Sequence, residues 1–453
     1  MANVRDFGAV GDGQADDTQA LQHAVDQGDG RVQIGKGSFR ITQTIQVDTT
    51  KRGFLSIEGK SGVARVIMDG GGPAFRIVGD HRGTATPSTV KPPTWERERM
   101  PMVRSLEILG RHPEADGVQL YRTMQTTMQN LLIRNCRYGV HLLERNRNFL
   151  LNASHIYDCG DTGVFFDRCN LHQVIIIGNH ISFCKRAGLR QLDGDVHNIQ
   201  ITGNDIEYNS GIDAENSGEI VLEAPDGVIS EYTISSNTLQ ATLPARGANV
   251  LVIGREEKPA MSVRLLAITG NVLGSRDKNI VLRHARTATI SGNTIYSGEQ
   301  LNIEATDSHH LAISGNTIHT RPANWKSENG DGVRLGRCVS CSITGNLLND
   351  SKLGDRQRGG AITLEQCDRC SVSSCQIDNP HFAGVDLQDC TRCRISDNSI
   401  VDDRDPIAMY AAVRLHGASR DNLIQNNAIT HGRDAAVHCP IEMGVMRSNT
   451  IWP

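Results

Sequence analysis

The sequence predicts an all-β fold, a single-stranded parallel β-helix of about a dozen coils with a capping helix at its N-terminus. Three observations lead to this prediction. The pattern Ile-(Ser/Thr)-Gly-Asn-x-(Ile/Leu) recurs along the chain at intervals of 22 to 34 residues. A second pattern, Gly-Val-x-Leu or a close variant, stands about eight to fourteen residues before each copy. The 45 glycines and the 4% content of aromatic residues suit many short strands joined by tight turns.

The length of the chain also favours a repeat architecture. At 453 residues it is too long for one ordinary globular core, whereas a solenoid grows along one axis. The repeat intervals have a floor of 22 to 25 residues with occasional additions of 7 to 12, as expected of a solenoid with loop insertions. We therefore predict an N-terminal capping segment over 1–45 and one continuous β-helical domain over 46–453.

The capping segment contains a predicted helix. Asp16 or Asp17 can cap its N-terminus, and the helix ends near Gly28. A solenoid exposes apolar core at its ends, so a helix with one apolar face would cover this end. The apolar positions recur at helical spacing and are Ala20, Leu21, Ala24 and Val25.

Both repeated patterns are predicted to be strands, because each alternates apolar with variable residues. One coil then consists of the Gly-Val-x-Leu strand, a short corner, a strand ending at the Asn, a short strand and a variable loop. Three short strands per turn are typical of a parallel β-helix, whose coils stack about 4.8 Å apart.

The repeated Asn is interpreted as structural rather than catalytic. A bend at the same place in every coil leaves backbone groups unpaired, and a stacked Asn side chain can bond both to that backbone and to the next Asn. The aligned positions are Asn179, Asn204, Asn237, Asn271, Asn293, Asn316, Asn346, Cys375, Asn398, Asn427 and Asn449.

Three consecutive Cys-x-x-Cys pairs, 338/341, 367/370 and 390/393, would suggest zinc in another context. In other coils, however, the same positions hold mostly small or apolar residues. Because free cysteine behaves as a small hydrophobe, stacked interior thiols are favoured over a metal site or disulfides.

Charge and hydropathy exclude two classes of partner. The net charge is −4, with Lys and Arg scattered along the chain, so nucleic acid is not an expected partner. No apolar run approaches the roughly 18 residues of a membrane span, and the first residues lack the pattern of a secretory signal.

The N-terminal motifs carry a resemblance to a known family. The stretch Asp-Phe-Gly-Ala-Val-Gly-Asp-Gly at 6–13, then Asp16-Asp17-Thr18, Ala20 and Gln22, and then Gly-Ser-Phe-Arg-Ile at 37–41, resemble the start of the pectate-lyase superfamily, including its rhamnogalacturonase and epimerase-like members. The resemblance implies a right-handed parallel β-helix, a carbohydrate substrate, and a secreted or periplasmic protein. Many unpaired thiols suit a reducing compartment instead, so both compartments stay open.

The candidate site is the strand that follows the variable loops, because loops on one face of a solenoid usually build its binding site. In the later coils the outward positions of this strand are crowded with charge. Glu365 and Asp386 are expected on adjacent coils, about 7–8 Å apart. Glu304 and Glu365 are expected two coils apart, about 10 Å. Either pair suits an inverting glycosidase, which needs roughly 6.5–9.5 Å.

The basic residues nearby suggest a second chemistry. Arg334 and Arg414 could hold a uronate or sulfate, and His416 could abstract a proton for β-elimination. Arg283 and an outward Asn302 complete the predicted binding face, and Trp95 could stack on a sugar ring. The competing interpretation is a row of charged pairs on a solvated sheet.

Calcium is the one cofactor that the sequence suggests, because hard cations take oxygen ligands from loop acids, which otherwise cap turns. The candidate acids are Asp213, Glu215, Asp331, Asp402, Asp403 and Asp405.

Three functions remain open. The first is a glycoside hydrolase with paired carboxylates, and the second is a polysaccharide lyase or epimerase using Arg, His or Lys. The third is a non-catalytic glycan-binding or tail-fibre-like solenoid, for which a homotrimer is the expected assembly.

Overall fold

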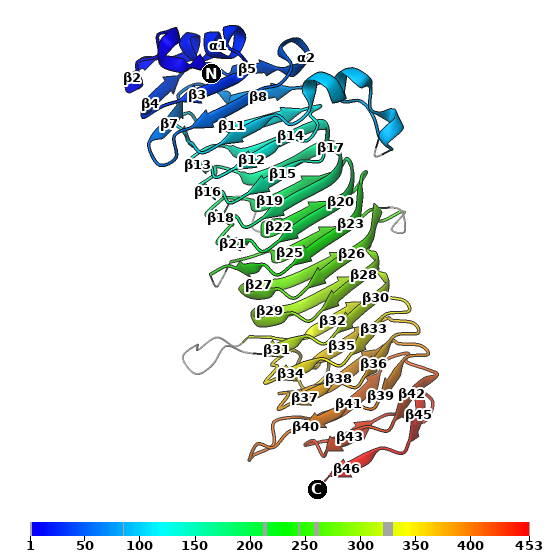
Figure 1. Cartoon of the computed structure of the whole chain (residues 1–453). Helices are drawn as coiled ribbons and strands as arrows, with labels where there is room; N and C mark the ends of the chain where they lie inside the picture. Colours follow the sequence, from blue (N-terminus) through cyan, green and yellow to red (C-terminus); the bar gives the residue numbers. More distant parts are fainter. Residues whose placement is uncertain are drawn as a thin grey trace. The chain divides into compact units, whose positions relative to one another are not determined.

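The computed structural model describes residues 2–84, 86–211, 215–242, 245–257, 262–319 and 329–452. The chain divides into two compact units, residues 1–233 and 234–453, and within each of them Figure 1 shows successive strands that run side by side. Within each unit every coil adds one strand to each of three parallel sheets. The first sheet holds the Gly-Val-x-Leu strands, the second holds the strands that end at the Asn, and the third holds the short strands that precede the loops. The predicted parallel β-helix and its strand order are confirmed, whereas one continuous domain over 46–453 stays a prediction.

The predicted capping helix is α1 (Thr18–Gln27), which buries the four expected apolar side chains. Its N-cap differs in detail from the expectation. The Asp17 carboxylate accepts hydrogen bonds from the backbone N–H groups of Val10 and Gly11 at 2.6 and 3.0 Å, so it holds the preceding loop. Asp16 accepts from the Thr18 N–H at 3.0 Å instead. The other short helices of this unit are η1 (Val4–Phe7), α2 (Thr49–Arg52), η2 (Pro87–Thr89) and η3 (Thr94–Glu98).

The strands of the first unit pair with the strand one coil away. Its first sheet contains β5 (Ile45–Asp48), β8 (Gly72–Val78), β11 (Ala115–Tyr121), β14 (Tyr138–Arg147), the start of β17 (Thr162–Ile177), β19 (Ala187–Leu192) and β22 (Gly218–Glu223). Its second sheet contains β1 (Ala2–Asn3), β3 (Arg31–Ile34), β6 (Ser56–Gly59), β9 (Met102–Arg104), β12 (Thr127–Gln129), β15 (Leu150–Asn152), the end of β17 and β20 (Asp195–Thr202). Its third sheet contains β2 (Asp12–Asp16), β4 (Gly37–Ile41), β7 (Ala64–Met68), β10 (Glu107–Gly110), β13 (Leu132–Arg134), β16 (His155–Tyr157), β18 (His180–Ser182) and β21 (Asp205–Glu207). The last strand, β23 (Val228–Ser235), begins in this unit.

The second unit repeats this arrangement. Its first sheet contains β25 (Ala248–Ile253), the ends of β27 (Val272–Arg283) and β29 (Thr294–Thr306), β32 (Val333–Gly336), β35 (Ile362–Glu365), β38 (Ala383–Gln388), β41 (Ala411–His416) and β44 (Ala435–His438). Its second sheet contains β26 (Val263–Thr269), β28 (Arg286–Ser291), β30 (His309–Ser314), β33 (Ser342–Thr344), β36 (Ser371–Ser373), β39 (Arg394–Ser396), β42 (Asn422–Gln425) and β45 (Gly444–Arg447). Its third sheet contains β24 (Thr238–Gln240), the starts of β27 and β29, β31 (Thr317–His319), β34 (Leu347–Asn349), β37 (Gln376–Asp378), β40 (Ser399–Val401), β43 (Ala428–Thr430) and β46 (Thr450–Trp452).

The Asn ladder has the predicted structural role. Asn293 donates from its backbone N–H and its side-chain amide to Asn316 Oδ1, at 3.0 and 2.9 Å. The Asn316 amide in turn donates to the carbonyl of Ile290 and to Asn346 Oδ1, at 3.1 and 2.9 Å. Each buried amide therefore satisfies a backbone group at the corner and links one coil to the next.

The cysteine pairs lie inside the coils, as predicted. All six thiols are buried and free, and the cysteines of each pair stack on those of the neighbouring coils. Burial raises the pKa of Cys136, another interior cysteine, to about 12, so this thiol stays protonated and packs as a small apolar group.

Candidate functional site

The structure brings most of the predicted site residues together on the outer face of the first sheet of the second unit. One column of paired positions runs Glu304, Arg334, Thr363, Asp386 and Arg414. A second column, two residues further along each strand, runs Thr306, Gly336, Glu365, Gln388 and His416. Glu365 and Asp386 therefore lie diagonally on adjacent strands, as the repeat spacing predicts.

Asp386 is fully engaged by other protein groups. Its side chain is 1% exposed, accepts from Arg414 Nε at 2.6 Å, and lies 3.0 Å from His416 Nε2. The two terminal nitrogens of Arg414 donate to the carbonyls of Arg356 and Gly359, at 2.6 and 2.9 Å. Arg414 therefore ties the loop 351–360 over Asp386, so these two predicted site residues position other groups and do not face a ligand on the outer surface.

His416 keeps a free side towards solvent. Its imidazole is 26% exposed, and Asp386 lies beside Nε2. Within the described ranges, Nδ1 has no hydrogen-bond partner. The Asp386 carboxylate can only accept a hydrogen bond from Nε2–H, and this contact favours the tautomer whose Nδ1 is a base.

Two further ion pairs line the same face. Arg334 donates to Glu365 Oε2 at 2.6 Å, and both side chains are partly exposed. Lys278 Nζ donates to Glu304 Oε2, also at 2.6 Å. Arg334 Nε is buried and, among the described residues, lacks a hydrogen-bond acceptor. Arg283 is exposed at the end of β27 and pairs with Thr306 on β29, the strand between β27 and β32.

The prediction that Asn302 faces outward is wrong. Asn302 is fully buried. The side-chain amide of Asn279 donates to Asn302 Oδ1, and Asn302 Nδ2 donates to Asp331 Oδ1 at 2.7 Å. The predicted pairing placed Asn302 two residues out of register, because Glu304 rather than Asn302 aligns with Val281 and Arg334. Asn302 therefore lies within β29 with its side chain buried, and it contributes to packing.

Trp95 and the loop acids lie apart from this face or have other partners. Trp95 belongs to η3 in the first unit, where 39% of it is exposed. Asp331 accepts a hydrogen bond from the side-chain amide of Asn302. Burial would raise the pKa of Asp402, but hydrogen bonds from Arg404 and backbone N–H groups lower it to about 2, so this carboxylate caps its own turn. Asp213 lies outside the described residues, and calcium binding stays a prediction.

The sequence reasoning missed a titratable cluster on the third sheet of the first unit. His155, His180 and Asp205 are paired positions on β16, β18 and β21. The His155 and His180 rings stack 5.1 Å apart, and His180 Nδ1 lies 3.2 Å from Asp205 Oδ2. The signal was available, because these three residues are spaced by 25 and 25, and His180 and Asp205 directly follow the repeated Asn179 and Asn204.

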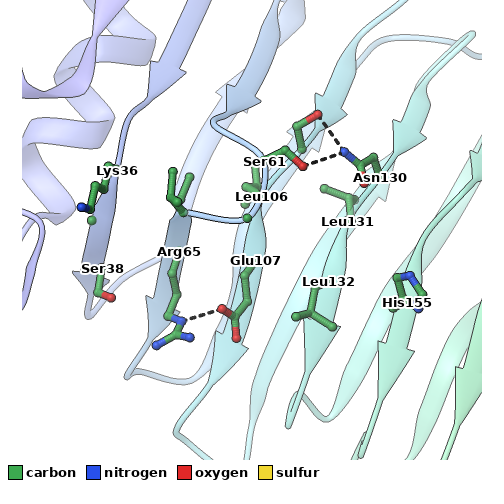
Figure 2. Close-up of a pocket in the computed structure, with 15 residues that line it drawn as sticks. Lys36, Ser38, Ser61, Arg65, Leu106, Glu107, Asn130, Leu131, Leu132 and His155 are labelled. Carbon is green, nitrogen blue, oxygen red and sulfur yellow. Dashed lines mark hydrogen bonds and ion pairs between the residues drawn. The ribbon is translucent and has the colours of Figure 1, made fainter.

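A groove lies beside this cluster in the first unit (Figure 2). Its volume is about 440 Å³, and its lining includes Lys36, Arg65, Asn130 and His155. Arg65 Nε donates to Glu107 Oε2 at 2.6 Å across the groove floor (Figure 2). Basic and polar side chains therefore line a hollow that ends at His155.

One group of side chains within the described residues could hold a metal ion. His172, Asp195 and His197 in the first unit have ligand atoms within 4.8 Å of one another. The two imidazoles stack 5.0 Å apart, and His197 Nε2 lies 2.7 Å from Asp195 Oδ1.

None of the helices among the described residues is long and apolar enough to cross a membrane.

Comparisons with known proteins agree with this architecture. A family model described as right handed beta helix region matches residues 107–250 and 278–451, which is more than half of the chain. A second model, described as Rhamnogalacturonase A/epimerase, pectate lyase-like, matches residues 1–54. No curated protein matches the sequence.

Similar solved structures come from phage and bacteria. Tailspike protein 3 of bacteriophage CBA120 is 13% identical with a TM-score of 0.43, covering 100% of this chain and 62% of its own. The A-module of a mannuronan C-5 epimerase from Azotobacter vinelandii is 15% identical with a TM-score of 0.41, covering 100% of both chains. The catalytic unit of an α-1,3-glucanase from Streptomyces thermodiastaticus is 16% identical with a TM-score of 0.37, covering 100% of this chain and 70% of its own. These similarities concern the fold alone, and this chain spans 62% of the length of the tailspike.

Proposed function

We propose, from the premise that this chain belongs to the right-handed β-helix family, that it is a carbohydrate-active enzyme that cleaves an acidic polysaccharide. The match of residues 1–54 to a model for rhamnogalacturonase and epimerase proteins supports a carbohydrate substrate. The face described above, with Glu304, Arg334, Glu365 and His416, is the proposed active site.

One observation favours β-elimination over hydrolysis by paired carboxylates. Asp386 is buried and both of its oxygens lie against Arg414 and His416, so it is not free to act on a substrate. The partly exposed group that it orients is the imidazole of His416. The free acid–base group beside Asp386 is therefore a histidine, and the carboxylates of the other predicted pair, Glu304 and Glu365, are each held in an ion pair.

In the proposed reaction, His416 is the base and Arg334 binds the uronate. His416 Nδ1 takes the proton from the carbon next to the uronate carboxylate, and the electron pair left behind forms a carbon–carbon double bond. The glycosidic C–O bond on the following carbon breaks, and the leaving oxygen takes a proton from water. Arg334, whose Nη2 donates to Glu365 and whose side chain is 42% exposed, binds the uronate and stabilises the negative charge that develops on the substrate.

The test is a panel of acidic polysaccharides assayed for the ultraviolet absorbance of unsaturated uronate products. We expect His416→Gln to lower kcat/KM by about 10²- to 10⁴-fold, the contribution typical of a general base. His438→Gln is the matched control, because His438 is exposed on the next strand, β44, where it lies opposite Arg414 in the strand register. Full activity of His416→Gln would refute this site, and new reducing ends without unsaturated products would indicate a hydrolase.

A non-catalytic, glycan-binding or tail-fibre-like solenoid is the second candidate. The observation that favours it is that Glu304 and Glu365 each form an ion pair with a neighbouring basic side chain, as charged rows on solvated sheets do. Retention of a glycan without product formation, together with a homotrimer by light scattering, would support this second function.

A further inference from the structure

An exposed aromatic pair in the first unit occupies positions that suit other residues. Phe183 and Tyr208 lie at the corner after β18 and β21, and each has a φ of 61°. Bulky residues adopt this left-handed conformation rarely, whereas Asn and Asp tolerate it. The equivalent corners of the two preceding coils hold Asn135 and Asp158, with φ of 57° and 54°.

Backbone hydrogen bonds establish that these corners are equivalent. The N–H groups of Asn135, Asp158 and Phe183 each donate to the carbonyl of the last strand residue one coil on, at 3.2, 3.1 and 3.3 Å. The acceptors are Tyr157, Ser182 and Glu207. The same bend is therefore made by a well-suited residue in two coils and by an aromatic one in the next two.

The aromatic pair is partly exposed to solvent. The two rings stack 5.5 Å apart at an angle of 15°, yet Phe183 remains 55% exposed. Phe183 therefore presents a large apolar ring to solvent at a backbone position that smaller polar residues adopt more easily.

The groups beside this aromatic pair are suited to sugar hydroxyls. Glu207 directly precedes Tyr208, and Asp205 lies two residues earlier on the same face of β21. The Asp205 side chain is 39% exposed, and its Oδ2 lies 3.2 Å from His180 Nδ1. Burial, the charge of Asp205 and a hydrogen bond between the two carboxyl groups raise the pKa of Glu207. Two neighbouring carboxyl groups therefore lie beside a partly exposed aromatic pair.

We propose that this face is a second carbohydrate site, in which a neutral sugar ring stacks on the exposed ring of Phe183, which Tyr208 supports from the next coil, while its hydroxyl groups bond to the carboxyl groups of Asp205 and Glu207. The two carboxyl groups disfavour a uronate here, in contrast to the basic residues of the proposed active site. His155 and His180 continue the face towards the groove that His155 lines, so an extended saccharide has a path along the third sheet (Figure 2). This inference goes beyond the proposed function, because the site lies in the first unit and involves none of the same residues.

Affinity electrophoresis of the full chain tests the proposal, with gels containing mixed-linkage β-glucan, arabinoxylan or polygalacturonate. The test variant carries both Phe183→Asn and Tyr208→Asn, so that each corner holds asparagine, as the equivalent corner at Asn135 does. We expect a neutral polysaccharide to retard the wild type, and at least a tenfold weaker affinity in the variant. Its Tm should be unchanged or higher, because asparagine suits this backbone better.

The controls separate this site from others. Phe54→Ala removes another exposed phenylalanine of the first unit and should leave binding unchanged, as should His416→Gln. Phe183→Tyr should retain binding, because the stacking surface is kept. The proposal is overturned if the double variant binds like the wild type, or if no neutral gel retards the wild type. It is also overturned if only polygalacturonate retards the wild type. A fall of several degrees in the Tm of the double variant would overturn it as well, since the aromatic pair would then serve to stabilise the fold.

Discussion

Two carboxylate–arginine pairs on the first sheet have the same length but should contribute very differently to stability. Asp386 and Arg414 lie 2.6 Å apart with side chains 1% and 9% exposed, whereas Glu365 and Arg334 lie 2.6 Å apart with side chains 31% and 42% exposed. Removal of one charge from a buried pair leaves the other charge uncompensated, which costs about 3–5 kcal/mol. Exposed pairs are screened by water and salt and contribute about 0–1 kcal/mol.

We expect Asp386→Asn to lower the free energy of unfolding by about 3 kcal/mol, at the lower end of that range because the asparagine oxygen can still accept from Arg414. Glu365→Gln is the matched variant, with an expected loss of at most about 1 kcal/mol. Loss of the Asp386 charge has a local consequence as well, because Arg414, which this charge positions, also donates hydrogen bonds to the carbonyls of Arg356 and Gly359. The loop 351–360 should therefore become more accessible to proteases.

Urea unfolding of the full-length chain, followed by circular dichroism, measures both variants under the same conditions. The difference between them should be at least about 2 kcal/mol. Equal losses, within about 0.5 kcal/mol, would refute the reasoning that burial rather than distance sets the strength of these pairs. Raised salt should weaken the Glu365 pair and leave the Asp386 pair nearly unaffected, because only the first is exposed to screening.

Three further predictions concern the core and the first unit. Cys375 interrupts the Asn ladder, with Asn346 Nδ2 only 3.9 Å from its sulfur, so Cys375→Asn should complete the ladder and raise the free energy of unfolding by about 0.5–1.5 kcal/mol in urea titrations. Cys439 is the one partly exposed cysteine among twelve, so Ellman's reagent should label one thiol quickly and the remaining eleven only after unfolding; fast labelling of several would contradict their interior position. Burial, with the charges of Arg147 and Arg145, lowers the pKa of His81 to about 4, while an unfolded chain binds this proton near pH 6.5. Stability should therefore fall as the pH drops from 6.5 towards 4, and His81→Gln should remove up to about 3 kcal/mol of that acid-induced loss, which a series of urea titrations between pH 7 and pH 4 would measure.

The sequence alone was sufficient for the architecture, because a β-helix converts sequence period into spatial neighbourhood. Residues one repeat apart lie on adjacent strands, so Asn293 and Asn316 could be paired from their 23-residue spacing, as the structure confirms. The same rule placed the cysteine pairs inside the coils and Glu365 diagonal to Asp386. Every one of these inferences uses only the alternation of side chains along a strand and the stacking of equal positions.

Tertiary structure decided the environment of each outward side chain. Asp386 points outward by alternation but is buried under the loop 351–360, and a loop's path over a sheet follows from its own turns and hydrogen bonds rather than from the repeat. Asn302 was misplaced because the pairing of β27 with β29 shifts register between Arg276 and Lys278, so the alignment of the later part of β29 does not follow from the repeat spacing. The pairing of Glu365 with Arg334, and the raised pKa of Glu207 beside Asp205, depend on side-chain conformations and burial. Sequence period thus determines which residues are neighbours, whereas their charge state, partners and access to a ligand are set by loops and packing in three dimensions.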